Sequence, residues 1–134
     1  MSKNLYRLRQ VGELMSLKAV FGSDDGMKSV RLLVDTGSSY TVLPTDLLQE
    51  LGCDLQKPIS RMALVTAGGT VYAPIVAVPW FSCLGQRYEN FPVIAKDVPF
   101  GTFTSGLLGM DFLRKCDAII YTKRAEILVE FGDE

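Results

Sequence analysis

The chain is built from short apolar or alternating runs, and this pattern restricts the available folds most strongly. The runs are separated by Gly, Pro, Asp or Ser, which is typical of β-strands. Two segments between them have helix signals, one with Thr45 as N-cap and Gly52 as C-terminal stop, the other with Asp111 as cap. Strands are expected over residues 5–11, 14–21, 28–34, 39–43, 60–67, 70–82, 87–95, 117–122 and 126–131, and helices over 44–52 and 110–116. With no linker or repeat, the 134 residues predict one all-β domain, a closed barrel or sandwich with one or two short helices.

The charge pattern and the apolar segments exclude several kinds of partner. The 14 Lys and Arg residues are scattered among 15 Asp and Glu residues, so we expect no nucleic acid partner. No apolar stretch approaches the roughly 20 residues needed to span a membrane. The first ten residues lack the apolar segment of a secretory signal, and the three cysteines (Cys53, Cys83 and Cys116) are too widely spaced for a metal-binding or redox pair. We therefore expect a cytoplasmic protein with reduced, mostly buried thiols.

The sequence contains no histidine, which removes several reaction mechanisms. Serine or cysteine hydrolysis with a histidine base is excluded within this chain, and so are histidine zinc sites. An enzyme made from this chain must use carboxylates, Lys, Tyr or a bound cofactor.

One segment places a carboxylate where such chemistry needs it. In "LLVDTGSSYTVLP" (32–44), the apolar run Leu32 to Val34 ends at Asp35. Gly37 permits a sharp turn that brings its N–H toward this carboxylate, and the Ser38 hydroxyl can donate to the same group. Both donors favour the ionised acid. The alternative is an ordinary Asp-Gly turn between two strands.

Two further motifs follow in a fixed order. The segment "TAGGT" contains Ala67, Gly68, Gly69 and Thr70 and predicts a hairpin tip in which both glycines can take positive φ. Further along, "SGLLGMDFL" contains Leu107, Leu108 and Gly109, which indicate a core strand with a closely packed glycine.

This order resembles the retropepsin-like aspartic proteases, single-domain retroviral-type enzymes, and is closer to the bacterial, cellular and gag-related members than to viral enzymes. The resemblance implies a catalytic loop at Asp35, Thr36 and Gly37, with Ser38 tuning the acid. It implies a substrate-covering flap at Ala67 to Thr70, and a strand at Leu107 to Gly109 that supports the loop. Asp111 is then interpreted as a helix cap, not a second catalytic acid.

The D-T-G triplet occurs once, so the resemblance implies a C2 homodimer in which each chain supplies one Asp35. Two carboxylates about 3 Å apart share a proton and activate a water for peptide hydrolysis, so no metal or other cofactor is expected. The substrate is an extended polypeptide whose apolar side chains we expect to contact Met62, Val71, Leu107 and Leu108. Ser38 predicts an acidic pH optimum, below about 6.

The termini and the function each leave alternatives open. Residues 1–134 form a single domain, in which residues 1–10 are either an interface strand or a terminal extension. In the family both chain ends pair into the dimer sheet, and the strand over 125–131 is able to do so here. The leading function is an aspartic endopeptidase. The alternatives are a dimeric peptide-binding scaffold on the same fold and an unrelated small β-barrel binding protein with a coincidental D-T-G.

Overall fold

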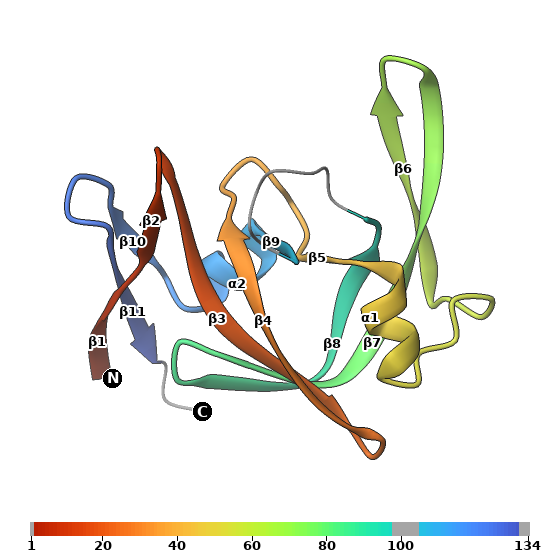
Figure 1. Ribbon diagram of the computed structural model, residues 1–134, viewed down its shortest axis with the longest axis horizontal. Helices are drawn as coiled ribbons and strands as arrows, with labels where there is room; N and C mark the ends of the chain where they lie inside the picture. Colours follow the sequence, from red (N-terminus) through yellow and green to blue (C-terminus); the bar gives the residue numbers. More distant parts are fainter. Residues whose placement is uncertain (1, 98–104, 132–134) are drawn as a thin grey trace.

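A computed structural model describes residues 2–97 and 105–131, and in this part of the chain the strands form two sheets. The larger sheet has the order β2-β3-β4-β9-β5-β8-β7-β6, and an additional pairing between β3 and β7 closes six of these strands into a barrel (Figure 1). The strands are β1 (Ser2–Arg7), β2 (Arg9–Val11), β3 (Leu14–Ser23), β4 (Gly26–Val34), β5 (Val42–Leu43), β6 (Ser60–Thr66), β7 (Gly69–Cys83), β8 (Gln86–Ala95), β9 (Gly106–Leu108), β10 (Ile119–Tyr121) and β11 (Glu126–Phe131). The helices are α1 (Thr45–Glu50) and α2 (Met110–Lys115). The all-β barrel with two short helices is confirmed.

The smaller sheet joins the two ends of the chain in the order β1-β11-β10. The strand expected over 5–11 is divided at Leu8, a buried residue whose N–H donates to the Ala125 carbonyl at 2.8 Å. β1 therefore pairs with β11, whereas β2 pairs with β3 in the other sheet. β11 lies between two strands of its own chain, pairing with β1 from Glu126 to Phe131 and with β10 from Glu126 to Leu128.

Aromatic rings from three strands and one helix fill the barrel. Phe21 and Phe81 stack with ring centroids 4.4 Å apart, and Phe81 also contacts Phe91 and Phe112 at 5.0 and 5.3 Å. Burying such side chains supplies most of the stabilisation of a domain of this size. Phe112 attaches α2 to this core, directly behind the loop that follows β4.

The helices begin differently from the prediction. The N-cap of α1 is Pro44, because the N–H and hydroxyl of Thr45 both donate to the Asp97 carboxylate, at 3.1 and 3.3 Å. The N-cap of α2 is Gly109, and Asp111 lies inside the helix. Gly52 follows α1 with φ +82°, as a C-terminal stop requires.

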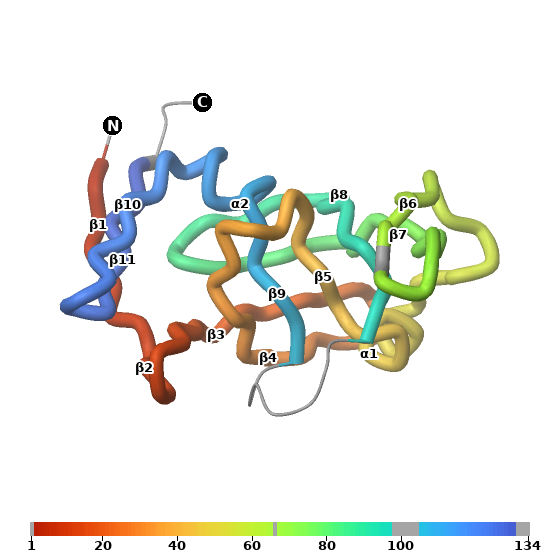
Figure 2. Tube along the Cα trace, turned by 90° about the horizontal axis from the view of Figure 1, so that it is seen from above, coloured from red at the N-terminus to blue at the C-terminus, as the bar shows by residue number. Residues whose placement is uncertain are grey.

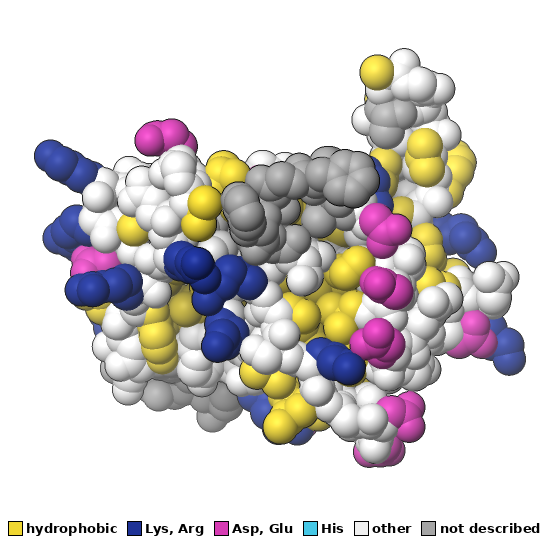
Figure 3. Space-filling view, in the orientation of Figure 1, with side chains coloured by type: hydrophobic (Ala, Val, Ile, Leu, Met, Phe, Trp, Pro, Cys, Tyr) yellow, Lys and Arg dark blue, Asp and Glu magenta, His cyan; other side chains and the backbone are white. Residues whose placement is uncertain are grey.

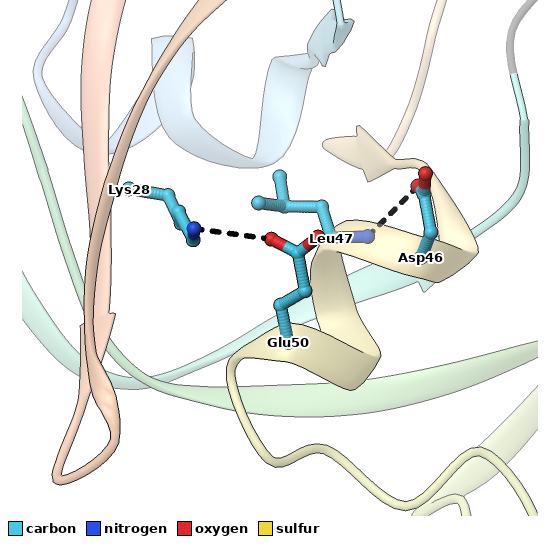
Figure 4. A network of polar contacts seen from close by, with 4 residues as sticks. All are labelled: Lys28, Asp46, Leu47 and Glu50. Atoms are coloured by element: carbon cyan, nitrogen blue, oxygen red, sulfur yellow. Dashed lines mark hydrogen bonds and ion pairs between the residues drawn. The ribbon is translucent and has the colours of Figure 1, made fainter.

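An ion pair fastens α1 to the barrel. Figure 4 shows the Lys28 ammonium of β4 and the Glu50 carboxylate of α1, 3.3 Å apart, while Asp46 accepts from the Leu47 N–H within the first turn. The pair is exposed, so its contribution to stability is small. Within the described residues, neither helix has the length and apolar character needed to cross a membrane.

The hairpin of β6 and β7 projects away from the barrel and carries exposed hydrophobic side chains along its length (Figure 3). These include Val65, Val71 and Tyr72. At its tip, Gly69 has φ +120°, whereas Gly68 does not have a positive φ. Apolar groups that remain in water on a projecting hairpin indicate a surface that acquires a partner or a ligand.

Candidate active site

Asp35 lies immediately after β4, at the point where the chain leaves the barrel. Its N–H donates to the Leu108 carbonyl at 3.0 Å, which continues the parallel pairing of β4 with β9. The Gly37 N–H donates to Asp35 Oδ1 at 2.9 Å, and the Ser38 N–H donates to the Asp35 carbonyl at 3.2 Å. The side chain of Asp35 is partly exposed, so it is fixed in orientation and still reachable from solvent.

The loop from Asp35 to Thr41 crosses over β9. β4 pairs with β9 on one side and β5 pairs with β9 on the other, so the chain leaves and re-enters the sheet around a single central strand (Figure 2). The central strand contains Leu107 and Leu108, which the sequence predicted to support the loop. Leu108 is fully buried, whereas Leu107 is partly exposed.

Two glycines bracket this central strand and let it approach its neighbours closely. A Cβ on Gly106 would overlap the Val42 carbonyl oxygen, and one on Gly109 would overlap the Tyr40 carbonyl and lie 2.9 Å from the Ser38 carbonyl oxygen. Only glycine fits either position without moving backbone. The sequence pattern identified Gly109 and missed Gly106.

A second hydrogen-bonded cluster holds the far end of the loop, and the sequence did not indicate it. The N–H and hydroxyl of Thr41 donate to the two carboxylate oxygens of Asp111, at 3.0 and 2.9 Å. The Thr41 hydroxyl oxygen also accepts from the Gly109 N–H at 3.2 Å. Two further backbone bonds, from the Met110 and Asp111 N–H groups to the Ser38 and Ser39 carbonyls, join α2 to the loop. Asp111 therefore braces the loop from behind, and its carboxylate is engaged away from Asp35.

The buried position of Asp111 changes its titration. Burial raises the pKa of Asp111 above its ordinary value, while the two Thr41 hydrogen bonds, the Phe112 N–H and nearby Lys115 lower it in part. The hydrogen-bond donors around Asp111 stabilise its ionised form, because a buried charge without such partners is costly.

Ser38 differs from its expected contact. Its hydroxyl donates to the Tyr40 carbonyl at 2.6 Å, so the structure gives this side chain an acceptor other than the Asp35 carboxylate. The tight turn places the Tyr40 carbonyl two residues ahead, within reach of a short side chain. The hydroxyl thus stabilises the turn, and the Gly37 N–H alone of the two expected donors contacts the acid.

A cavity of about 470 Å³ opens beside the loop on the side of the hairpin. Its wall contains the loop segment Gly37 to Tyr40 and, from the hairpin and the barrel, Met62, Leu64, Val42, Ile94 and Leu107, with Lys96 and Asp97 also lining it. Of the four residues expected to contact substrate side chains, Met62 and Leu107 line this cavity. Leu108 is fully buried, and Val71 is exposed on the hairpin.

Asp35 thus lies on a loop whose next residues, from Gly37 to Tyr40, line an apolar cavity together with residues of the projecting hairpin. The sequence matches the aspartyl protease family over residues 19–112, most of the chain, so the protein belongs to this family.

Solved structures are consistent with this assignment. The chain is similar to a retropepsin-like aspartic protease from Rickettsia conorii, with TM-score 0.68 and 20% identity, covering 96% of this chain and 92% of the other. It is also similar to the EIAV protease in complex with an inhibitor, with TM-score 0.54 and 16% identity, covering 84% of this chain and 97% of the other. At these identities the likeness establishes a shared retropepsin-like fold. No curated protein matches the sequence.

Proposed function

We propose that the protein is an aspartic endopeptidase that acts as a homodimer, with one Asp35 from each chain in a single active site. The observation that carries this proposal is the position of Asp35. It is held by the Leu108 carbonyl and the Gly37 N–H, is partly exposed, and lies two residues before the loop segment Gly37 to Tyr40, which lines an apolar cavity. The contact with the Gly37 N–H also occurs in ordinary turns, so catalysis is supported by the combination of a partly exposed, oriented acid with a loop that lines an apolar cavity.

One chain supplies one such acid, and a twofold axis beside the loop supplies the second. Thr36 and Gly37 are exposed, so they are free to meet their counterparts in a second copy. In that arrangement the two Thr36 side chains brace the paired loops across the axis.

The mechanism follows from two carboxylates about 3 Å apart, which hold one proton between them because both cannot be ionised easily. The ionised carboxylate removes a proton from a water held by the pair, and that water attacks the peptide carbonyl carbon. The protonated carboxyl donates its proton to the carbonyl oxygen as the tetrahedral intermediate forms. Collapse of the intermediate breaks the C–N bond, and the amine leaves with a proton from the pair. The two titrations belong to the pair and not to either chain.

The substrate is an extended polypeptide with hydrophobic side chains near the cleaved bond. The apolar wall of the cavity, with Met62, Leu64 and Leu107, favours such side chains, and its volume suits a large one. The hairpin of β6 and β7, with Ala67 to Thr70 at its tip, is proposed to cover the peptide and add strand-like hydrogen bonds. Burial of Val71 and Tyr72 against the peptide or a second copy would explain their exposure in the single chain.

The cytoplasm is the proposed location, because the three cysteines are unpaired and two of them are buried.

The test compares the wild type with Asp35→Asn, a substitution of nearly equal volume. Both proteins are incubated with an unfolded protein substrate from acid to neutral pH, and products are identified by mass spectrometry. We expect cleavage by the wild type alone, blocked by pepstatin and next to hydrophobic residues. It should be strongest in acid because the carboxylate pair must hold one proton, not because of Ser38, whose hydroxyl donates to Tyr40. If both proteins are dimeric and neither cleaves, the peptide-binding scaffold replaces the protease. Equal cleavage by both proteins would remove Asp35 from the mechanism.

A further inference from the structure

The outer face of the barrel carries basic side chains that come from three neighbouring strands. On β3, Leu17 points into the core, so Ser16 and Lys18 on either side of it point outward. Arg9 of β2 lies opposite Ser16, and Arg31 of β4 lies opposite Lys18. Opposed residues share a face, so Arg9, Lys18 and Arg31 form one group, the outer basic cluster. Figure 3 shows Lys and Arg side chains gathered over β3.

The outer basic cluster surrounds a cavity of about 600 Å³. The other walls of this cavity are the chain that leads from β1 into β2, including Arg7, and the turn between β7 and β8. Ser16 also lines it, although only 4% of this residue is exposed, and its hydroxyl oxygen accepts from Arg31 Nη1 at 3.3 Å. The described lining thus contains four cations, one of them anchored to a buried hydroxyl, and no carboxylate.

The positive charge of this cavity is not neutralised by the rest of the described chain. Within residues 2–97 and 105–131, none of the four cations takes part in an ion pair. Lys18 and Arg31 are directly opposed on neighbouring strands, an arrangement in which like charges destabilise a sheet. Arg7 lies opposite Glu126, but the Glu126 carboxylate is bound by Arg124 at 2.8 Å. An anionic ligand would supply the missing negative charge.

The spacing of the cluster favours a particular kind of anion. The opposed pair Lys18 and Arg31 is separated by about 5 Å at Cβ, and Arg9 lies on a diagonal of about 7–8 Å from Lys18. Side chains on one side of an extended peptide are spaced by about 7 Å, so acidic residues at alternate positions can meet these cations in turn. The lining has one aromatic residue, half-buried Tyr6, so it offers no exposed platform on which nucleic acid bases could stack.

We propose that the outer basic cluster binds an acidic segment of a polypeptide in extended form, with its Asp or Glu carboxylates paired to Arg9, Lys18 and Arg31. This cavity and the substrate cavity share no lining residue among those described, so the acidic segment leaves the substrate cavity open. The interaction does not use Asp35. It therefore does not depend on the proposed peptidase activity.

The experiment measures binding of a fluorescein-labelled oligoglutamate peptide by fluorescence anisotropy at neutral pH and low salt. The test variant is Lys18→Gln/Arg31→Gln. Its matched control, Lys57→Gln/Lys123→Gln, removes the same charge from exposed positions outside the cavity. We expect the test variant to bind about tenfold more weakly and the control to change by less than about twofold, because only the test variant loses the paired cations. Lys18→Arg keeps the charge and should retain binding.

Several outcomes would overturn this inference. Equal losses in the test and control variants would show that net charge alone attracts the peptide. If the wild type binds an oligonucleotide or tripolyphosphate through the cluster and does not bind the peptide, the ligand is of another class. Asp35→Asn should bind the peptide as the wild type does, and loss of binding in this variant would place the peptide in the candidate active site instead. An inactive wild type that still binds through the cluster would refute the proposed function alone.

A stability measurement tests the origin of the cluster independently. Lys18→Gln relieves the repulsion with Arg31, so its midpoint of urea unfolding should be higher than that of the wild type in low salt. High salt screens the repulsion and should remove this difference. A lower midpoint for Lys18→Gln in low salt would show that these cations serve the fold, and would contradict a cluster maintained for a ligand.

Discussion

The substitution Thr41→Val tests the brace behind the active-site loop at nearly constant volume. Thr41 is fully buried, and its hydroxyl donates to Asp111 Oδ1 at 2.9 Å and accepts from the Gly109 N–H at 3.2 Å. Valine keeps the shape of the side chain and removes both hydrogen bonds, so the effect reports polar contacts and not packing.

The magnitude can be worked from these two bonds. A hydrogen bond to an ionised group contributes about 1.5–3 kcal/mol, and an orphaned buried N–H costs about 1–3 kcal/mol. The two terms share one hydroxyl and are not additive, so we expect the free energy of unfolding to fall by about 3 kcal/mol. The assay is urea unfolding at fixed protein concentration, followed by Trp80 fluorescence.

The chain provides its own control. The Thr45 hydroxyl also donates to an aspartate, Asp97, at 3.3 Å, but on the exposed surface. Thr45→Val should therefore cost about 0.5 kcal/mol or less. If Thr41→Val costs no more than Thr45→Val, the brace does not stabilise the loop and the reasoning is refuted.

The same variant has a predictable pH dependence. Burial raises the pKa of Asp111 above 3.8, and the Thr41 bonds hold it lower than burial alone would, so Thr41→Val raises that pKa further. A carboxyl whose pKa is raised by folding stabilises the folded state at low pH, and this stability is lost as the pH rises through the folded pKa. The loss in free energy of unfolding caused by Thr41→Val should thus be largest at neutral pH and smaller in mild acid. It should shrink by about 1.4 kcal/mol for each unit by which the folded-state pKa of Asp111 in the variant exceeds that in the wild type. A deficit that grows in acid would contradict the assignment of Asp111 as the acceptor.

Three further outcomes are expected. Gly109→Ala should lower the free energy of unfolding by about 1–3 kcal/mol and lower activity, because the new Cβ would overlap the Tyr40 carbonyl. The backbone itself adds no cost, since φ −98° is allowed for any residue. Unchanged unfolding and turnover would contradict this. Ser38→Ala should leave the acidic limb of the pH–activity profile in place, because the hydroxyl donates to Tyr40 and not to the catalytic acid; a shifted limb would restore the tuning role expected from the sequence. In the native protein, a thiol reagent should label half-buried Cys53 well before Cys83, where burial raises the thiol pKa; mass spectrometry that finds Cys83 labelled first would disagree.

Local patterns were sufficient for the parts of the site made by adjacent residues. The apolar run before Asp35 predicted a buried strand, and Gly37 predicted the N–H that reaches the carboxylate two residues back. Such contacts depend on a few backbone angles, so the residue types largely determine them.

The contacts that the sequence did not reveal join distant residues. Thr41 and Asp111 are 70 positions apart, and Thr45 and Asp97 are 52 apart. A local pattern interprets Asp111 as a cap and Thr45 as a cap, because aspartate and threonine favour that position. In the structure both side chains make tertiary contacts instead, and the N-cap residues are Pro44 for α1 and Gly109 for α2.

The order of strands in the smaller sheet also depends on contacts between distant parts of the chain. The resemblance gave the strand over 125–131 a place in a sheet with the chain ends, and β11 does pair with β1 along its length. Its neighbours could not be deduced from composition, since a central strand and an interface strand have the same apolar pattern. The structure places β11 in the centre and leaves β10 at the edge.

The central claim is that two Asp35 carboxylates from two chains make one active site. Mixing wild-type chains with Asp35→Asn chains, at a concentration where dimers are complete, tests it most directly. Random pairing with an equal amount of the inactive chain should reduce peptidase activity to about half, because half of the wild-type chains then pair with an inactive partner. Activity that stays unchanged on mixing, while native mass spectrometry detects the mixed dimers, would show that each chain acts alone and would contradict the account.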